Sequence, residues 1–422
     1  MNKYCNAKNI KAQLDAYVMN QEAGTRAIAM AIAQHLRSIE CAETGDLAQT
    51  DNVLVIGPSG CGKTETYRVL SRLERDFGCP VAMYNALDYA PTGSWKGSSV
   101  SNIFKDIFKR ATSLYDELGG HEDESPEEQK DAVIKIAEHA IIILDEIDKI
   151  VLTADSSSRQ FSLDYQSNLL KIVEGNTYDL GEFELASDND DESEKEEAGN
   201  VLLDSTHMMF IFMGAFTGIE DIVRWRLHRE QRSKQRRNAW HDCYQETNIG
   251  FMADTDGGRP QDKSDETIVP SQDDIIAFGF SRELLGRLPI ITVYKPLSED
   301  SLVDIMLNCK TSAYRKYQAR FRQNGHTLRC GRSALREIAR IAIERGTGAR
   351  GLMTVFSELL RDTQYEMSGD TRNLHCLLRG KDIRDQRRPL IRDVTAKHKS
   401  QREKYLRRMA QRLKRRRSGK EQ

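Results

Sequence analysis

One octapeptide constrains the fold of this 422-residue chain more than any other segment, because it requires a specific local structure. It matches the pattern G-x-x-x-x-G-K-[ST], whose glycines let successive backbone N–H groups turn inward around phosphate oxygens. A β-rich run, Val53–Ile56, precedes it and a helical pattern follows. The segment therefore predicts a buried strand, a phosphate-binding loop and a helix. Its residues are Gly57, Pro58, Ser59, Gly60, Cys61, Gly62, Lys63 and Thr64.

Two other short apolar runs, Ile141–Leu144 and Met208–Met213, have the pattern of strands buried on both faces. Helical patterns separate these runs, so the sequence predicts an α/β fold with a parallel sheet covered by helices. After Pro296 the apolar spacing is helical only, with Ser298 as a helix N-cap. We therefore expect a large α/β domain over 1–295, a small all-α domain over 296–395 and a basic tail over 396–422.

Two carboxylates, Asp145 and Glu146, end the run Ile141–Leu144. Alone, such a pair is a common solvated strand end. Beside a phosphate loop, the first carboxylate can hold Mg²⁺ through water and the second can orient and deprotonate an attacking water. We expect Lys63 to reach the β- and γ-phosphates and Thr64 to offer its hydroxyl to Mg²⁺. The predicted ligands are ATP and Mg²⁺, with Glu65 also counted among the nucleotide-binding residues.

The net charge of −2 conceals a strong asymmetry, since residues 397–420 carry twelve Lys and Arg against one acid. Acidic inserts are expected as solvated loops near 119–130 and 182–199, and a basic insert near 224–237. No apolar run approaches the length of a membrane span, and no signal peptide pattern follows Met1. The eight cysteines include no C-x-x-C pair, which argues against structural zinc and favours a reducing cytoplasm.

Five motifs in order make the sequence resemble an AAA+ ATPase, and more narrowly a ClpX-type unfoldase. The resemblance runs from about Lys11 to about Tyr365. Its motifs are the adenine-side segment 14–22, the Walker B run 143–150, the Gly-Ala-Phe stretch with Phe216 and Gly218, the segment Gly286–Pro289, and the segment 347–352. The Gly-Ala-Phe stretch follows the strand that carries sensor 1 in this family. That strand ends Phe212-Met213-Gly214-Ala215, without the polar residue that many AAA+ proteins carry there, so we assign no sensor-1 residue.

The resemblance implies roles for four residues outside the phosphate loop and the Walker B run. Tyr17 and Val18 would lie beside the adenine. Arg287 would act as an arginine finger on the nucleotide of a neighbouring subunit, and Arg350 would contact the phosphates of its own subunit. Arginines in such positions neutralise charge that develops on the leaving phosphate. Ordinary surface or salt-bridge arginines are the alternative interpretation.

The resemblance also implies two segments that contact other proteins. Trp95 and Lys96 fall where the family has its pore-1 loop, which grips polypeptide; a surface turn is the alternative. Lys96 replaces the usual aliphatic residue. Ile249, Gly250 and Phe251 reproduce the tripeptide with which ClpX-type proteins dock on their peptidase ring; a local apolar anchor is the alternative.

The main functional hypothesis is a homo-oligomeric ATPase, a hexamer by resemblance, that threads unfolded or tagged proteins to a Clp-type peptidase. It would have no protease activity of its own. The alternatives are a remodelling chaperone that works without a peptidase and, less favoured, a nucleic-acid-linked AAA+ motor using the basic tail. The cysteine pattern also predicts that the family's N-terminal zinc-binding domain is missing.

Overall fold

The computed structural model of the chain describes residues 4, 6–42, 50–89, 100–119, 125–151, 156–182, 200–242 and 269–393. The chain divides into two compact units. Unit 1 comprises residues 1–14, 21–58 and 63–295, and unit 2 comprises residues 15–20, 59–62 and 296–422. None of the helices in the described ranges is long and apolar enough to cross a membrane.

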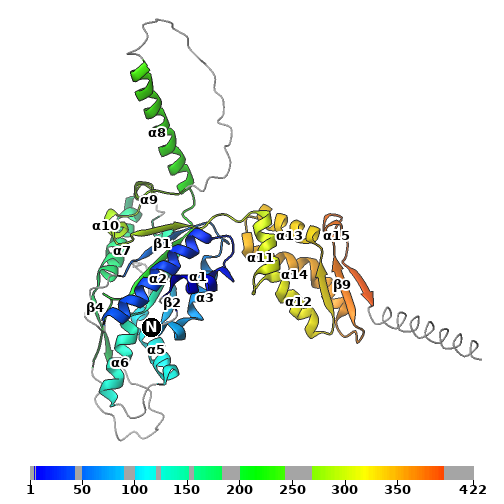
Figure 1. Ribbon diagram of the computed structural model, residues 1–422, viewed down its shortest axis with the longest axis horizontal. Coiled ribbons are helices and arrows are strands. Elements are labelled where there is room, and N and C mark those ends of the chain that lie inside the picture. The colour runs from blue at the N-terminus through cyan, green and yellow to red at the C-terminus, as the bar shows by residue number, and fades with distance from the viewer. Residues whose placement is uncertain are drawn as a thin grey trace, which may run out of the picture. The chain divides into compact units, whose positions relative to one another are not determined.

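Unit 1 is built on a sheet of five parallel strands in the order β2-β3-β6-β1-β7 (Figure 1). Every residue of β1 and β6 is buried, so helices cover both faces of the sheet centre. The predicted α/β fold with a parallel sheet is therefore confirmed. The strands are β1 (Val53–Ile56), β2 (Val81–Asn85), β3 (Ile141–Asp145), β6 (Met209–Gly214) and β7 (Ile290–Val293).

The helix α5 buries an apolar stripe in the core of unit 1, with Phe104, Ile107, Phe108 and Ala111. A separate antiparallel pair, β4 (Thr177–Glu182) and β5 (Asn200–Asp204), adds Leu180 and Leu203 to the same core. The helices are α1 (Ala7–Asp15), α2 (Glu22–Ala42), α3 (Lys63–Ser71), α4 (Glu74–Phe77), η2 (Ala86–Tyr89), α5 (Val100–Leu118), α6 (Pro126–Glu138), η3 (Ile147–Ile150), α7 (Ser156–Glu174), α8 (Ile219–Asp242), α9 (Gln272–Phe278) and α10 (Arg282–Gly286).

Two of the predicted inserts contain helix. The expectation of a loop near 119–130 is wrong from Ser125 onward, because a capping box starts α6 there. Ser125 Oγ accepts from the Glu128 N–H, and Glu128 Oε2 accepts from the Ser125 N–H at 2.9 Å. The basic segment 224–237 lies within α8, which projects from the rest of unit 1 in Figure 1. Most of the second acidic insert, residues 183–199, lies outside the described residues.

Unit 2 contains a helical core and a small sheet. Ser298 caps the first helix as predicted, since its Oγ accepts from the Ser301 N–H at 3.2 Å. The helices are α11 (Glu299–Asn308), α12 (Ala313–Gln323), α13 (Arg332–Glu344), α14 (Gly348–Met367) and α15 (Gly380–Arg384), and the strands are β8 (Thr327–Cys330), β9 (Leu374–Leu378) and β10 (Leu390–Asp393).

The expectation of helices alone after Pro296 is wrong, because β8, β9 and β10 form a three-stranded sheet in the order β10-β9-β8. β9 alternates between buried and half-buried positions, with Leu374, Cys376 and Leu378 facing the core. That alternation spans only five residues and follows a long helix, so helical spacing dominated the pattern in the sequence.

A buried histidine of α2 contacts the residue His139, which lies shortly before β3. His35 is fully buried; its Nε2 donates to the His139 carbonyl at 2.9 Å, and its Nδ1 lies 3.2 Å from Thr50 Oγ1. A neutral ring satisfies both contacts, since Nδ1 then accepts from the hydroxyl. Burial, with a smaller contribution from the charges of His139 and His207, lowers the pKa of His35 to about 4.

We expect the stability of unit 1 to fall as the pH drops from about 6.5 towards 4. In that window the unfolded chain protonates His35 and the folded chain does not, so acid favours unfolding by up to ~3 kcal/mol. Urea unfolding followed by circular dichroism at several pH values would measure this. His35→Gln, whose amide can still donate to the His139 carbonyl, should show a shallower pH dependence than the native chain. The exposed His228→Gln is the control. Equal pH dependence in the native chain and His35→Gln would contradict the prediction.

Candidate active site

The phosphate loop follows β1 as the sequence predicts, and α3 begins at Lys63. The Gly57 N–H donates to the Gly214 carbonyl at 3.1 Å, which ties the start of the loop to the end of the neighbouring strand β6. Lys63 Nζ donates to the Gly57 carbonyl and, at 3.0 Å, to the Pro58 carbonyl. The ammonium group is thus held over the first turn of the loop, with the half-buried Thr64 directly after it.

Asp145 and Glu146 lie at the carboxyl end of β3, the strand between β2 and β6. Asp145 is paired in register with Asn85 of β2. Asp145 Oδ1 accepts from the Glu146 N–H at 2.9 Å. Glu146 has φ +61° and ψ +29°, a left-handed conformation that is strained for a residue other than glycine. The two carboxylates therefore follow each other in a turn at the end of one strand.

Two neighbouring side chains fix the Glu146 carboxylate. Asn85 Nδ2 donates to Glu146 Oε2 at 3.0 Å, and Lys149 Nζ lies 2.8 Å from the same oxygen. The side chain of Glu146 remains 38% exposed, so a carboxylate oxygen can still meet a water molecule. Asn85 and Lys149 were not predicted from the sequence. Asn85 could have been found by recognising 81–85 as a strand, because parallel strands end at the same edge of a sheet.

The electrostatic setting of Asp145 suits a cation. Burial is the main cause that raises its pKa, and the charges of Glu146 and Asp148 raise it further, while the Lys63 ammonium opposes them. A positive ion next to Asp145 would favour its charged form. Hydroxyl and carboxylate oxygens such as those of Thr64 and Asp145 are the ligand types that Mg²⁺ prefers.

A buried carboxylate links the ends of β3 and β6. Asp148 is 3% exposed, and its Oδ1 accepts from the Ala215 N–H at 2.9 Å. A Cβ atom on Gly214 would lie 2.7 Å from that oxygen and 2.6 Å from the ring of Phe216. Asp148 and Phe216 therefore leave no room for a side chain at position 214, within the stretch 212–215 that carries no polar residue.

The apex of the phosphate loop, residues 59–62, groups with unit 2. The Ala349 N–H donates to the Gly60 carbonyl at 3.3 Å. Gly60 has φ +77°, and a Cβ there would lie 2.6 Å from the Thr347 carbonyl oxygen. Gly62 has φ +113°, and a Cβ there would lie 3.2 Å from Val18 Cγ1. Both positions therefore require glycine.

Two other segments of unit 2 contact the apex of the phosphate loop. They are the adenine-side segment, through Val18, and the segment 347–352. Cys61 is buried, and Val18 packs beside Gly62. The Tyr17 carbonyl accepts from the Cys309 thiol at 3.5 Å, and Lys310 Nζ lies 5.6 Å from the centre of the Tyr17 ring. Unit 2 thus contains three segments that are far apart in the sequence: residues 15–20, 59–62 and 347–352. The resemblance implies that all three contact the same bound nucleotide.

The predicted arginines occupy exposed positions. Arg287 directly follows α10, and its guanidinium contacts Glu174 Oε1 at 2.7 Å; the two side chains are 55% and 40% exposed. Arg350 is exposed in the first turn of α14. Glu65 forms an ion pair with Arg68 at 3.0 Å within α3.

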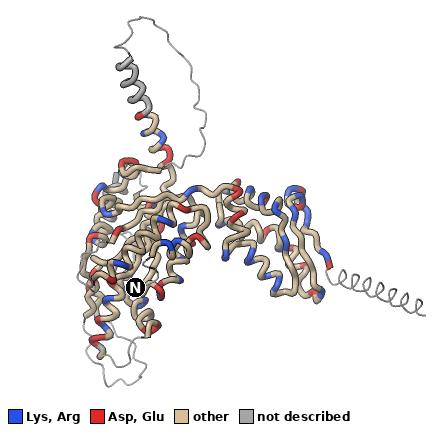
Figure 2. Tube along the Cα trace, in the orientation of Figure 1, with Lys and Arg blue, Asp and Glu red and all other residues tan. Residues whose placement is uncertain are grey.

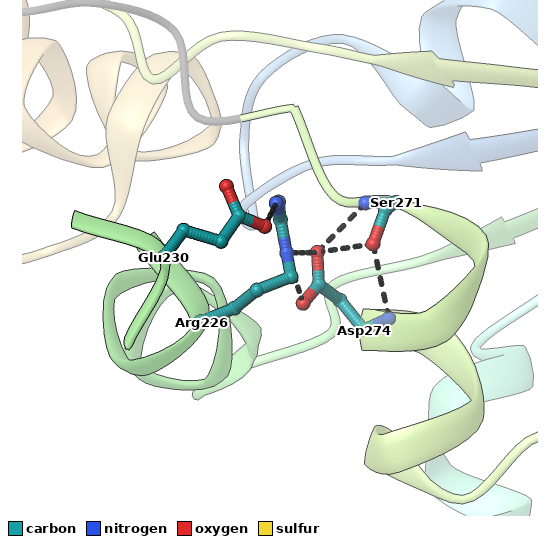
Figure 3. A network of polar contacts seen from close by, with 4 residues as sticks. All are labelled: Arg226, Glu230, Ser271 and Asp274. Atoms are coloured by element: carbon teal, nitrogen blue, oxygen red, sulfur yellow. Dashed lines mark hydrogen bonds and ion pairs between the residues drawn. The ribbon is translucent and has the colours of Figure 1, made fainter. Parts of the chain in front are cut away.

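The predicted protein-contact residues Trp95, Lys96, Ile249, Gly250 and Phe251 lie outside the described residues. The helix α8, which precedes Ile249, Gly250 and Phe251 in the chain, takes part in the polar network drawn in Figure 3. Arg226 Nε of α8 contacts Asp274 Oδ1 at 2.9 Å and Oδ2 at 3.0 Å. Burial alone would raise the pKa of Asp274, but hydrogen bonds from Arg226 and Ser271 hold it below its ordinary value. A buried carboxylate thus joins α8 to α9 on either side of residues 243–268.

Comparisons with known proteins agree with this geometry. The family described as AAA domain (Cdc48 subfamily) matches residues 48–291. The chain is 29% identical to the ATP-dependent Clp protease ATP-binding subunit ClpX of Treponema denticola, over 85% of this chain and 76% of that protein. It is 28% identical to the proteins of the same name from Borrelia duttonii and Borrelia recurrentis, over 85% of this chain and 74% of each.

Proposed function

The chain belongs to the AAA domain family, and from that premise we propose that it is an ATP-driven protein unfoldase. In this proposal several copies form a ring, a hexamer by resemblance, that threads polypeptide and delivers it to a Clp-type peptidase. The observation that carries the ATPase part is that the phosphate loop with Lys63 follows β1, while Asp145 and Glu146 lie at the carboxyl end of β3, two positions along the same parallel sheet and within the segment that matches the family. The resemblance to ClpX supports the unfoldase part.

Nucleotide binding would use residues from both ends and the apex of the phosphate loop. The backbone N–H groups of the loop and Lys63 would hold the phosphates, with the positive end of α3 behind them. Tyr17 and Val18 would line the adenine side. Thr64 and Asp145 would hold Mg²⁺, largely through water, and the ion would neutralise charge on the phosphate oxygens.

Hydrolysis would depend on Glu146 as the general base. Its carboxylate would accept a proton from the attacking water while Asn85 and Lys149 keep one of its oxygens in place. Arg350 would contact phosphates of the same subunit, and Arg287 those of a neighbour. The exposed Arg287–Glu174 pair costs little to break, because exposed ion pairs contribute about 0–1 kcal/mol.

Delivery to a peptidase is supported by the names of the similar proteins, which describe an ATP-binding subunit of the Clp protease. In this proposal Ile249, Gly250 and Phe251 dock on the peptidase ring, and Trp95 with Lys96 grips the substrate in the pore. The Arg226–Asp274 contact would give the docking segment a fixed base at both of its ends.

We expect Phe251→Ala to weaken ATP-dependent co-assembly with a Clp peptidase ring by at least about tenfold, because a buried aromatic anchor carries much of the energy of such an interface. Analytical ultracentrifugation of the full chain with the peptidase would measure this. Met252→Ala is the matched control, since it truncates an adjacent apolar residue outside the tripeptide. Co-assembly that Phe251→Ala leaves unchanged would remove the docking proposal and favour a remodelling chaperone that works without a peptidase.

A further inference from the structure

Unit 2 contains a long stretch without a single acidic residue. Between Asp304 and Glu337 the chain has eight Lys and Arg and no Asp or Glu. The centre of this stretch is α12, Ala313–Gln323, followed by β8. Figure 2 shows Lys and Arg recurring along this helix. A helix of this charge in a chain whose net charge is −2 marks a local excess of positive potential.

The cations of α12 share one side of the helix. Its apolar residues Tyr314, Tyr317 and Phe321 are buried in the core of unit 2. At 100° per residue, four exposed cations fall on an arc of about 160° on the opposite side. Arg315 and Arg322 lie two turns apart, which is about 10 Å along the axis. We call this set the α12 cationic face; its members are Arg315, Lys316, Arg320 and Arg322.

These cations differ in their partners from nine other arginines of unit 2. Within the described part of the chain, none of the four has a carboxylate within ion-pair distance. Arg315 donates to the Leu307 carbonyl at 3.2 Å, and Arg320 lies 5.0 Å from the centre of the Tyr317 ring. Nine arginines elsewhere in the unit each contact an Asp or Glu: Arg336, Arg340, Arg345, Arg361, Arg372, Arg379, Arg384, Arg387 and Arg388.

The residues between the cations indicate the kind of partner. Ala319 and Gln323 lie between them on the helix surface, and both are exposed. The face thus offers no large apolar or aromatic anchor, which the core of a protein interface needs. A phosphodiester backbone needs no such anchor, because cations that displace its counterions supply the binding energy.

We propose that the α12 cationic face binds the phosphate backbone of duplex nucleic acid without regard to sequence. This function is separate from the proposed unfoldase activity and requires no residue of the nucleotide site. If the proposed unfoldase function holds, the face would also bring the ATPase close to proteins bound to that nucleic acid.

The test compares two full-length variants that lose the same charge from the same unit. One carries R315Q, K316Q, R320Q and R322Q. The matched control carries R345Q, R361Q, R387Q and R388Q, which removes four cations that have acidic partners. Fluorescence anisotropy with a labelled 25-base-pair DNA duplex, between about 50 and 200 mM salt, gives the affinity and its salt dependence. Both variants retain the basic tail, so binding through the tail alone affects them equally.

We expect the α12 variant to bind at least about tenfold more weakly at 100 mM salt, and its slope of log K against log salt to be shallower by roughly three, since each phosphate contact adds about 0.9. The control variant should keep most of the native affinity and most of the native slope. Equal slopes in the two variants would overturn the proposal. A second result would also overturn it: polyglutamate that displaces the labelled duplex as well as unlabelled duplex does, at the same concentration of negative charge. The face would then bind acidic protein equally well. Circular dichroism and basal ATP hydrolysis check that both variants are folded.

Discussion

Glu146→Gln is expected to bind ATP within about threefold of the native affinity and to hydrolyse it at least ~100-fold more slowly. A general base typically contributes a factor of 10² to 10⁴, and an amide cannot accept the proton from water. Glutamine keeps the size of the side chain, and its amide oxygen can still accept from Asn85 Nδ2. The loss of the exposed contact with Lys149 should cost little stability. Phosphate release and binding of a fluorescent ATP analogue would measure the two quantities separately.

Glu117→Gln is the control for this result, because it makes the same change at an exposed residue of α5, which contributes nothing to the predicted site. It should hydrolyse ATP at the native rate. Hydrolysis in Glu146→Gln that stays within a few-fold of the native rate would show that another group takes the proton. Loss of ATP binding together with hydrolysis would instead mean that Glu146 holds the turn after β3 in place, as its left-handed backbone could require.

Arg287→Ala is expected to lower ATP hydrolysis by about 10³-fold while leaving ATP binding nearly unchanged, because arginine fingers are worth 10³ to 10⁵ in rate. The residue is exposed and contacts only the exposed Glu174 among the described acids, so its removal should not unfold unit 1. Glu174→Gln breaks the same ion pair and leaves the arginine in place. It should therefore change hydrolysis far less than Arg287→Ala does.

Mixed assemblies would show whether Arg287 acts between subunits. Arg287→Ala subunits keep Glu146, and Glu146→Gln subunits keep Arg287. In a mixed ring, a Glu146→Gln neighbour can supply its arginine to a competent Arg287→Ala site. The mixture should therefore hydrolyse ATP faster than either variant alone. Hydrolysis no higher than the sum of the two separate variants would refute action between subunits.

The sequence predicted those parts of the site whose residues are consecutive in the chain. The phosphate loop could be recognised because a buried strand precedes it, and Asp145 and Glu146 because they end another buried strand. Asn85 and Asp148 were missed, because their roles follow from the neighbours of β3 in the sheet. Lys149 was missed although its contact with Glu146 is local, three residues along the chain. The order of strands in a parallel sheet is set by packing, and one sequence does not display it.

The errors in the fold have an equally local cause. Ser125 and Glu128 form an S-x-x-E capping box, a helix start signal that the acidic composition of 119–130 obscured. Beyond Pro296, strands of four or five residues carry too few alternations to stand out against the long helices α13 and α14. The basic segment 224–237 lies in α8, and its composition alone did not distinguish a helix from a loop.

The closed space at Gly214 has an evolutionary consequence. A side chain at this position would collide with Asp148 and with Phe216, so a single substitution there should be purged by selection. Lineages could gain a polar group at this strand end only after residue 148 had become smaller and the aromatic ring had shifted. The two positions should therefore covary among relatives, with glycine at the first wherever the carboxylate is kept at the second.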